Sequence, residues 1–349
     1  MSAPHPSDRP IVVVGAGIVG TSIAYHVARA GRAVLVLDRG MVAAGTTGDS
    51  FGWAGIAGNS ATAIATGLRR GAAAAFLRLV DELDAPIALR RGGAIGWEET
   101  PEETAAYVRS HRDRGHRVEL ITGDEVRRRE PRLREAPAVA AWAPDDVGVD
   151  PAALARALRD AALAHGAVFR EQTTVDGIAV EQGMIRGVRI GDDVIEAETV
   201  VLAAGTAIPA LVRPLGLTVP IEASPCRLVR FATPEPLLAG VVSTPLFEAR
   251  QLDDRTILAA VDVDRGRVEV DAVRAEEELG VLHDALLGGE GITLIGTTVA
   301  DRPIPRGGQP IVGPVDGVPG LYLASAHAAV SLSGAIGAKV ARDLAGTSR

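Results

Sequence analysis

The feature that most constrains this chain is a strand, turn, helix and strand pattern close to its N-terminus. Residues 11–14 are four consecutive β-branched residues, the pattern of a strand buried on both faces of a parallel sheet. The next six residues, GAGIVG, have the spacing G-x-G-x-x-G, and residues 21–30 place apolar side chains at helical intervals. A second apolar run, 33–37, ends at Asp38. This order predicts a βαβ unit that binds a dinucleotide.

Each residue of this unit has a physical task. Gly15 permits the tight turn, Gly17 lets a pyrophosphate approach the backbone, and Gly20 lets the helix pack closely on the strand. The helix beginning near Ile18 offers free N–H groups and its positive dipole end to the same anion. The Asp38 carboxylate accepts hydrogen bonds from ribose hydroxyls and repels a 2′-phosphate. The fingerprint does not separate FAD from NAD, because both contain ADP.

Residues 44–55 form a loop of small residues that is far longer than a plain βα connection, and such a loop suits an extended flavin cofactor. Here the sequence resembles the D-amino-acid oxidase superfamily of flavoproteins, in particular its glycine oxidase and sarcosine oxidase branch. The resemblance spans nearly the whole chain. The segments that carry it, in the family's order, are GAGIVG…LDRG…GTTGDSFGWAG, residues 150–175, residues 199–205 and residues 301–337.

The resemblance implies that the cofactor is FAD. It assigns the following residues to the ribose, pyrophosphate and ring system: Arg39, Gly45, Thr46, Thr47, Ser50, Phe51 and Gly52. Val175 looks like the family residue whose backbone contacts adenine, and Ala204 and Gly205 resemble the strand end that returns beneath the cofactor. In the C-terminal segment the corresponding residues are Ser331, Leu332 and Ser333. Some relatives attach FAD through a cysteine, but the sole cysteine, Cys226, lies between domains, so we expect noncovalent FAD.

The expected fold class is α/β: a Rossmann-type FAD-binding domain with an α+β substrate domain whose mixed sheet covers the flavin. The FAD-binding domain is expected to be discontinuous, comprising residues 1–70, 146–217 and 301–349, and the substrate domain to comprise residues 71–145 and 218–300. The periodicity predicts helices over 73–83, 101–114 and 151–166, and strands over 93–97, 167–170, 173–175, 199–202, 227–232, 241–247 and 256–263.

Four residues are candidates for substrate contacts. Arg302 matches the position of the arginine that clamps the substrate carboxylate in glycine-oxidase-like members, and a planar guanidinium gives a bidentate grip. The alternative is a surface or flavin-phosphate arginine. Phe247 falls where related oxidases place a tyrosine that binds the same carboxylate. The missing hydroxyl favours a more apolar amine over glycine, unless Phe247 only packs in the core.

Trp53 and His327 carry two readings each. Trp53 either stacks against the pocket or is a buried structural residue. His327 resembles the family's histidine beside the flavin, although Ala326 precedes it where the family has glycine; it either tunes the bound amine or is a structural imidazole. Some relatives activate oxygen with a lysine over the flavin, and the only lysine, Lys339, lies in the terminal helix, which argues against that device.

Charge and composition exclude several other classes. The net charge is −8 and the sequence has no long blocks of one sign, so it shows no basic segment of the kind that binds nucleic acid. One cysteine cannot form an intramolecular disulfide or a cysteine zinc cluster, so we expect a cytoplasmic protein and no metal. No stretch of about 18 apolar residues predicts a membrane span. The expected partner is a small molecule.

The sequence leaves three functions open. The first is an FAD-dependent oxidase of an amine or amino acid: hydride passes to flavin N5, the imine hydrolyses, and O2 reoxidises the flavin to give H2O2. The second keeps the hydride step but passes the electrons to a quinone or a partner protein. The third is a non-catalytic flavin-binding subunit of a heteromeric complex. Substrate identity, stereochemistry and oligomeric state are not fixed by the sequence.

Overall fold

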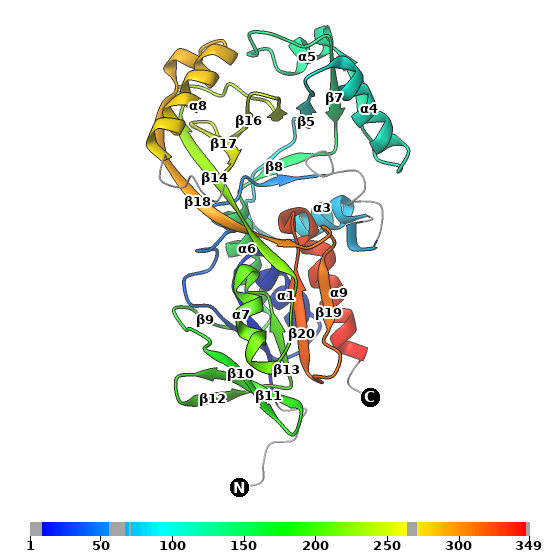
Figure 1. The fold of residues 1–349 in the computed structure, drawn as a ribbon, viewed down its shortest axis with the longest axis vertical. Helices are drawn as coiled ribbons and strands as arrows, with labels where there is room; N and C mark the ends of the chain where they lie inside the picture. Colours follow the sequence, from blue (N-terminus) through cyan, green and yellow to red (C-terminus); the bar gives the residue numbers. More distant parts are fainter. Residues whose placement is uncertain (1–8, 56–66, 70, 264–270, 347–349) are drawn as a thin grey trace.

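The computed structural model describes residues 9–55, 67–69, 71–263 and 271–346. Two sheets dominate these residues, one below the other in the view of Figure 1, and both described chain ends lie in the lower layer. The lower layer contains the βαβ unit. The upper layer is a larger sheet with helices at both of its ends.

The lower sheet has six strands in the order β19-β20-β13-β1-β2-β9. All neighbours are parallel except β19 and β20, which are antiparallel. The strands are β1 (Ile11–Val14), β2 (Val34–Leu37), β9 (Val168–Arg170), β13 (Thr199–Leu202), β19 (Ile311–Pro314) and β20 (Leu321–Ser325). The continuous apolar runs of β1, β2 and β13 are buried on both faces, as a parallel sheet requires. This confirms the Rossmann-type α/β fold.

Helices cover one face of this sheet and form its main core. They are α1 (Ile18–Arg29), α3 (Ala72–Glu82), α6 (Pro151–Ala164) and α9 (Ala329–Gly346). Helix α6 begins where the Asp150 carboxylate accepts the backbone N–H groups of Ala152 and Ala153, with Pro151 at the first helical position. The other face packs on helix α7 (Ile208–Val212) and a small antiparallel sheet of β10 (Gly177–Glu181), β11 (Met184–Ile190) and β12 (Asp193–Glu196).

The upper sheet has eight strands in the order β18-β14-β17-β16-β15-β5-β7-β6. It is mixed, because β15 and β5 are parallel and the other pairs antiparallel. The strands are β5 (Ala94–Gly96), β6 (Glu119–Thr122), β7 (Val139–Ala143), β14 (Ile221–Ala232), β15 (Val241–Ser243), β16 (Glu248–Asp253), β17 (Thr256–Asp262) and β18 (Thr293–Pro305). The helices of this layer are α4 (Pro101–Arg112), α5 (Gly123–Arg129) and α8 (Asp271–Ala285). The predicted mixed sheet is confirmed.

Two structures connect the layers. A small sheet of β3 (Trp53–Ala54), β8 (Val147–Val149) and β4 (Leu89–Arg90) lies between them. In addition, β14 and β18 pair along their whole lengths, from Ile221 opposite Pro305 to Ala232 opposite Thr293. Figure 1 shows this two-stranded ribbon running from the upper sheet down to the lower layer, where it contacts the short 3-10 turn at Gly205–Ala207.

The structure corrects two predicted strands. Residues 173–175 do not form a strand. The strand predicted over 241–247 ends at Ser243, because the Thr244 hydroxyl accepts the backbone N–H groups of Leu246 and Phe247 and turns the chain back into β16. The predicted domain boundaries stay a prediction. Helix α3, placed by that prediction in the substrate domain, packs on α9 in the core of the lower layer.

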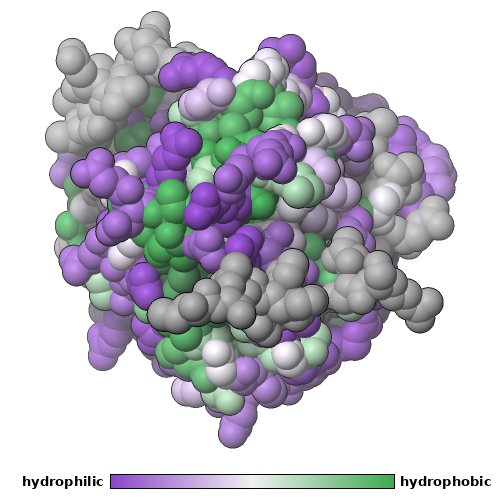
Figure 2. All heavy atoms as spheres, turned by 90° about the horizontal axis from the view of Figure 1, so that it is seen from below, coloured by the Kyte–Doolittle hydropathy of each residue, from purple (hydrophilic) through white to green (hydrophobic). Residues whose placement is uncertain are grey.

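None of the described helices is both long and apolar enough to cross a membrane. Figure 2 shows the end of the molecule that carries the lower layer, where apolar residues form separate patches among hydrophilic ones. Exposed apolar side chains in the strands of this layer include Val168, Met184 and Val194. Single exposed apolar residues of this kind are ordinary for a protein surface.

Candidate cofactor and substrate site

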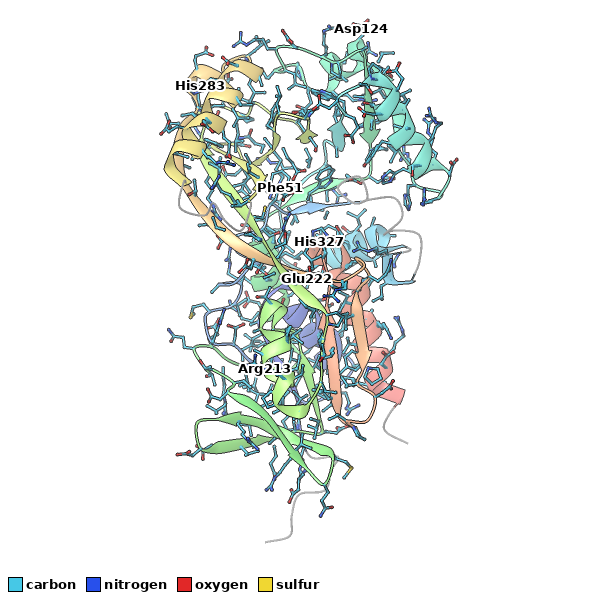
Figure 3. All side chains as sticks on the ribbon, viewed as in Figure 1. Phe51, Asp124, Arg213, Glu222, His283 and His327 are labelled. Atoms are coloured by element: carbon cyan, nitrogen blue, oxygen red, sulfur yellow. The ribbon has the colours of Figure 1, made fainter. Side chains whose placement is uncertain are left out.

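A cavity of ≈ 1090 Å³ lies between the two layers. Its floor includes the carboxyl ends of β1, β2, β13 and β20, at Val14, Leu37, Ala203 and Ser325. Strand β1 is the point where the strand order reverses, with β2 on one side and β13 on the other. Ligands of open α/β sheets bind at such a switch point. Figure 3 shows Phe51 and His327 at this level, between the upper and lower layers.

The glycine-rich turn forms a cradle that side chains would fill. Gly15 has φ +108°, and a Cβ there would lie 2.6 Å from the Ala203 carbonyl oxygen. A Cβ on Gly17 would lie 2.9 Å from the Thr47 hydroxyl, and one on Gly20 would lie 1.8 Å from the Gly15 carbonyl oxygen. Gly20 packs below the turn, and Gly15 and Gly17 border the cavity. The cradle therefore leaves room for a ligand at the start of α1, as a pyrophosphate requires.

Thr47 reaches this helix start from the long loop. Its hydroxyl oxygen accepts the backbone N–H of Ile18 at 3.0 Å, while Gly17 at the cap position has no side chain for that purpose. Thr46 is bonded differently, since its hydroxyl donates to the Asp301 carbonyl at 2.9 Å. The Thr47 hydroxyl proton is left to donate elsewhere, and a phosphate oxygen is a suitable acceptor.

Asp38 is fixed by the turn. One carboxylate oxygen accepts the N–H of Ala16 at 2.6 Å, and the other accepts the N–H of Gly40 at 2.7 Å. A carboxylate oxygen accepts more than one hydrogen bond, so both stay able to accept from a ribose. The predicted ribose contact fits this geometry and stays a prediction.

Most of the residues predicted to bind the cofactor border the cavity. They are Gly15, Gly17, Ile18, Asp38, Arg39, Gly45, Thr46, Thr47, Ser50, Phe51, Gly52, Val175, Ala204 and Gly205. Ser331, Leu332 and Ser333 do not: their side chains are buried inside the lower core, and the Ser333 hydroxyl donates to the Val330 carbonyl at 2.8 Å. Helix α9 is buried on every side at this turn, and the Ser331 hydroxyl accepts the backbone N–H of Gly55 at 3.1 Å. The cavity is bordered instead by Ala328, Ala329 and Val330.

The loop at Phe51–Trp53 is held by two buried polar side chains. Gly52 has φ +73°, and a Cβ there would lie 2.1 Å from the Val149 carbonyl oxygen. Arg250, almost fully buried, donates to the Phe51 and Val149 carbonyls, the latter at 2.7 Å. The Trp53 indole N–H donates to the buried Asp146 carboxylate at 2.8 Å, and its ring borders the cavity. Trp53 thus makes a structural hydrogen bond and also lies at the border of the pocket, so the structure is compatible with both predicted roles.

The upper sheet covers the cavity. We call this face the roof; its residues that border the cavity include Cys226, Ser243, Glu248, Ala260, Asp262 and Arg302. Strand pairing explains the grouping, because Cys226 is opposite Asp262, Ser243 is opposite Glu248, and Arg302 is opposite Ser224. Cross-strand partners share a face of a sheet.

Arg302 lies on the roof, as the resemblance implies for a clamp. One of its terminal nitrogens (Nη2) donates to the Ser224 hydroxyl at 2.9 Å and to the Asp262 carboxylate at 2.7 Å. Its Nε is buried and has no partner among the described residues. Asp262 is exposed, so this ion pair is screened by water and worth at most about 1 kcal/mol. A ligand carboxylate can therefore exchange with Asp262.

Glu248 is a roof carboxylate that the sequence prediction missed. Burial raises its pKa to about 7, and the neighbouring charge of Asp262 adds to this, while the Ser243 hydroxyl and Arg302 act in the opposite direction. The Ser243 hydroxyl donates to it at 3.4 Å. The sequence holds one signal for it. Side chains alternate between the two faces of a strand, so Glu248 lies on the same face of β16 as the buried Arg250.

His327 borders the cavity from the lower side. Burial lowers its pKa to about 4, with further lowering by the charges of Arg302 and Arg69, so the imidazole is neutral at pH 7. The next residue, Ala328, has φ +58°, which is uncommon for a residue with a side chain. This turn directs the chain into α9.

Phe247 and Cys226 also border the cavity. Phe247 packs in addition against the apolar cluster on the far side of the roof sheet, which agrees with the packing alternative. Cys226 lies within β14, and burial raises the pKa of its thiol. Lys339 pairs with Asp343 at 2.6 Å within α9 and does not border the cavity.

Comparison with known proteins agrees with this geometry. The family model for FAD-dependent oxidoreductases (DAO) matches residues 10–343. Glycine oxidase of Bacillus licheniformis is 34% identical over 216 residues, which are 59% of this chain and 56% of the relative. D-Amino acid dehydrogenase of Xanthobacter autotrophicus is 28% identical over 269 residues, 60% of this chain and 64% of the relative. The chain thus matches less than two thirds of the length of either relative.

Solved structures share the fold over nearly the whole chain. Glycine oxidase from Bacillus cereus superposes with a TM-score of 0.86 at 22% identity, covering 98% of this chain and 96% of that one. Iminodiacetate oxidase from Chelativorans superposes with a TM-score of 0.83 at 23% identity, covering 96% and 95%. The cradle, the long loop and the family match lead to one conclusion: the chain belongs to the DAO family of FAD-dependent oxidoreductases.

Proposed function

We propose that this protein binds FAD noncovalently in the cavity and oxidises an amine or amino acid to an imine, which hydrolyses in water. When bound, FAD would take up a hydride from the carbon that bears the nitrogen and would be reoxidised by O2, giving H2O2. Relatives named glycine oxidase and D-amino acid dehydrogenase support this reaction class. The single cysteine supports a cytoplasmic location.

The observation that carries the proposal is the position of Arg302, which borders the cavity above the flavin-binding residues and pairs through Nη2 with the exposed Asp262 at 2.7 Å. An ion pair with an exposed carboxylate is weak, so the guanidinium is available to another anion. A substrate carboxylate that replaces Asp262 forms the same charge-assisted hydrogen bond. Arg302 then orients the substrate beneath the roof.

Other residues of the chain complete the pocket. Phe51 and Trp53 border it, and Arg250 donates to the Phe51 carbonyl. His327, neutral at pH 7, adds no charge that would repel a substrate ammonium group. No side chain needs to act as a nucleophile, because the task of the protein is to orient the C–H bond of the substrate toward the flavin.

Dehydrogenation with another acceptor is the second candidate. Two D-amino acid dehydrogenases of Cereibacter sphaeroides are each 28% identical to this chain over 96% of its length. A non-catalytic role is the third, and one relative is the pyruvate dehydrogenase phosphatase regulatory subunit of Mus musculus, 28% identical over 57% of this chain. The hydride step is common to the first two candidates, and only the acceptor differs.

An anaerobic bleaching screen of the FAD-loaded protein tests the proposal. D-amino acids, L-amino acids, N-methyl amino acids and simple amines are mixed with it, and loss of flavin absorbance is measured. We expect bleaching by at least one amine, followed by peroxide on admission of air. Bleaching without peroxide would favour the dehydrogenase, and failure of every compound would contradict both.

Two arginine variants test the clamp. Arg302→Ala should raise KM for a substrate with a carboxylate by about tenfold, since a charge-assisted hydrogen bond is lost. Arg306→Ala is the matched control, because Arg306 is exposed, pairs with Glu222 at 3.2 Å and does not border the cavity. An unchanged KM in Arg302→Ala would remove the clamp.

A further inference from the structure

The roof carries more negative than positive charge. Arg302 and Asp262 compensate each other through their ion pair at 2.7 Å. Glu248 takes part in no ion pair among the described residues, and its hydrogen-bond partner is the Ser243 hydroxyl at 3.4 Å. The negative charge of a carboxylate that faces a cavity and has no cationic partner is neutralised either by a bound cation or by a proton.

The groups around Glu248 come from every neighbouring roof strand. Ser243 lies on β15, Asp262 on β17, Cys226 on β14 and Arg302 on β18. The charges of Asp262 and Arg302 act on Glu248 with opposite signs, and burial outweighs both. Glu248 thus changes charge near neutral pH, whereas the raised pKa of Cys226 keeps its thiol protonated there.

We propose that Glu248 is the group that binds the ammonium nitrogen of the substrate, so that a cationic amine is the primary requirement of this pocket. A carboxylate is secondary, because it binds Arg302 only in exchange for Asp262. This inference rests on the proposed function and deepens it, since it names which half of an amino acid the pocket recognises first.

The relative energies support this order. Binding an ammonium ion to Glu248 compensates a half-buried carboxylate that has no cationic partner, and hydrogen bonds between charged groups are about twice as strong as neutral ones. Binding a carboxylate to Arg302 replaces one anion by another, because Asp262 already occupies Nη2. The net gain at Arg302 is therefore smaller than the gain at Glu248.

Three small ligands of similar shape separate the two contacts: tert-butylamine, pivalate and 2-aminoisobutyrate. The first has only the amine, the second only the carboxylate, and the third has both. None has a hydrogen on the carbon that bears nitrogen, so hydride transfer cannot occur and binding is measured alone. The readout is the shift of the flavin absorbance spectrum of the FAD-loaded protein, titrated to give Kd.

We expect tert-butylamine to bind more tightly than pivalate at about pH 8, with the amine cationic throughout. Its affinity should rise about tenfold between about pH 6 and about pH 8, since Glu248 ionises over that interval. His327 does not contribute, because its lowered pKa of about 4 keeps it neutral throughout. Tighter binding of pivalate, or a flat pH profile for tert-butylamine, would overturn the inference.

Two isosteric variants make the test specific. Glu248→Gln should weaken tert-butylamine at least about tenfold and abolish its pH dependence. Asp262→Asn should instead tighten pivalate, because the competitor at Arg302 is removed. Unchanged tert-butylamine binding in Glu248→Gln would refute the role of Glu248. If Glu248→Gln does not fold, the pH series on the unaltered protein still decides.

The outcome is independent of the reaction itself. Absence of bleaching by oxidisable amines, combined with Glu248-dependent binding of tert-butylamine, would reject the proposed function and keep the amine site. Bleaching by amines without any effect of Glu248→Gln on tert-butylamine binding would keep the function and reject this inference.

Discussion

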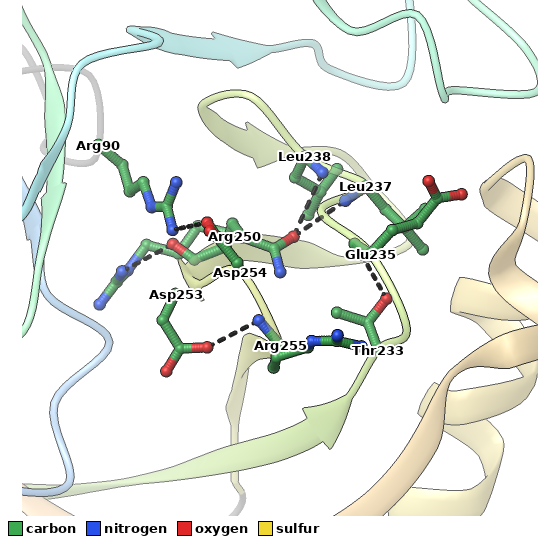
Figure 4. Close-up of polar contacts among 10 residues, drawn as sticks. Arg90, Thr233, Glu235, Leu237, Leu238, Arg250, Asp253, Asp254 and Arg255 are labelled. Carbon is green, nitrogen blue, oxygen red and sulfur yellow. Dashed lines mark hydrogen bonds and ion pairs between the residues drawn. The ribbon is translucent and has the colours of Figure 1, made fainter.

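Arg250 on the upper sheet donates a hydrogen bond to the backbone carbonyl of Val149 in the small sheet below, at 2.7 Å. The same guanidinium, drawn in Figure 4, donates to the carbonyls of Phe51 and Gln251. Burial lowers its pKa to about 10. One buried cation thus joins the roof to the flavin loop.

We predict that Arg250→Met destabilises the protein by about 2–4 kcal/mol, because the carbonyls of Phe51 and Val149 lose a charged donor. Urea unfolding of the FAD-loaded protein measures this, and flavin release should accompany it. Arg90→Met is the control: Arg90 pairs with the exposed Asp254 at 2.7 Å (Figure 4), and its loss should cost less than about 1 kcal/mol. Equal effects of the two variants would contradict the prediction.

Gly17→Ala should weaken FAD binding by more than about tenfold, since its Cβ would lie 2.9 Å from the Thr47 hydroxyl and displace it from the helix start. Gly177→Ala is the control, because a Cβ there meets nothing within 4 Å and Gly177 does not border the cavity. FAD affinity is measured by quenching of flavin fluorescence on titration into the apoprotein. Comparable losses in both variants would show that the Thr47 contact is not the cause.

His327→Gln should preserve the pH dependence of tert-butylamine binding near pH 7. The reason is that His327, with a pKa lowered to about 4, is already neutral above about pH 5 and gains no proton in this interval. The same spectral titration at each pH measures it. A profile that loses its inflection in His327→Gln would assign the titration to the imidazole instead of Glu248.

Acid precipitation should release FAD into a yellow supernatant from both the unaltered protein and Cys226→Ser. Cys226 borders the cavity, but burial raises the pKa of its thiol and so reduces the thiolate that could attack a flavin. The absorbance of the supernatant is compared with the flavin content before precipitation. Colour that stays with the precipitate of the unaltered protein but not with that of Cys226→Ser would show a covalent bond.

The lower layer was predictable from the sequence because its signals are local. Four apolar residues before the glycines give β1, and Asp150 with Pro151 gives the start of α6. The strand was predicted too far beyond Ser243, although Pro245 is a local signal for its end; the Thr244 hydroxyl contacts that form the turn are visible only in three dimensions. The contact of helix α3 with α9 could not be predicted, because its apolar stripe does not specify which core it meets.

The site was predictable to the extent that it follows the chain. Gly15, Gly17 and Asp38 lie within one βαβ unit, so spacing alone brings them together. The roof is different. Glu248 and Asp262 belong to different strands, and their common face depends on the register of a mixed sheet. Period-2 patterns give the face of each strand but not the pairing between strands.

The ribbon of β14 and β18 connects the two layers through continuous, paired backbone. Its ladder extends from Ile221 to Ala232, with one register shift between Arg230 and Phe231. A movement that lifted the roof would have to bend this ladder, because both of its strands continue from the roof into the lower layer. We therefore expect the backbone of the ribbon to limit the clearance between roof and floor, and with it the thickness of the substrate that the cavity admits.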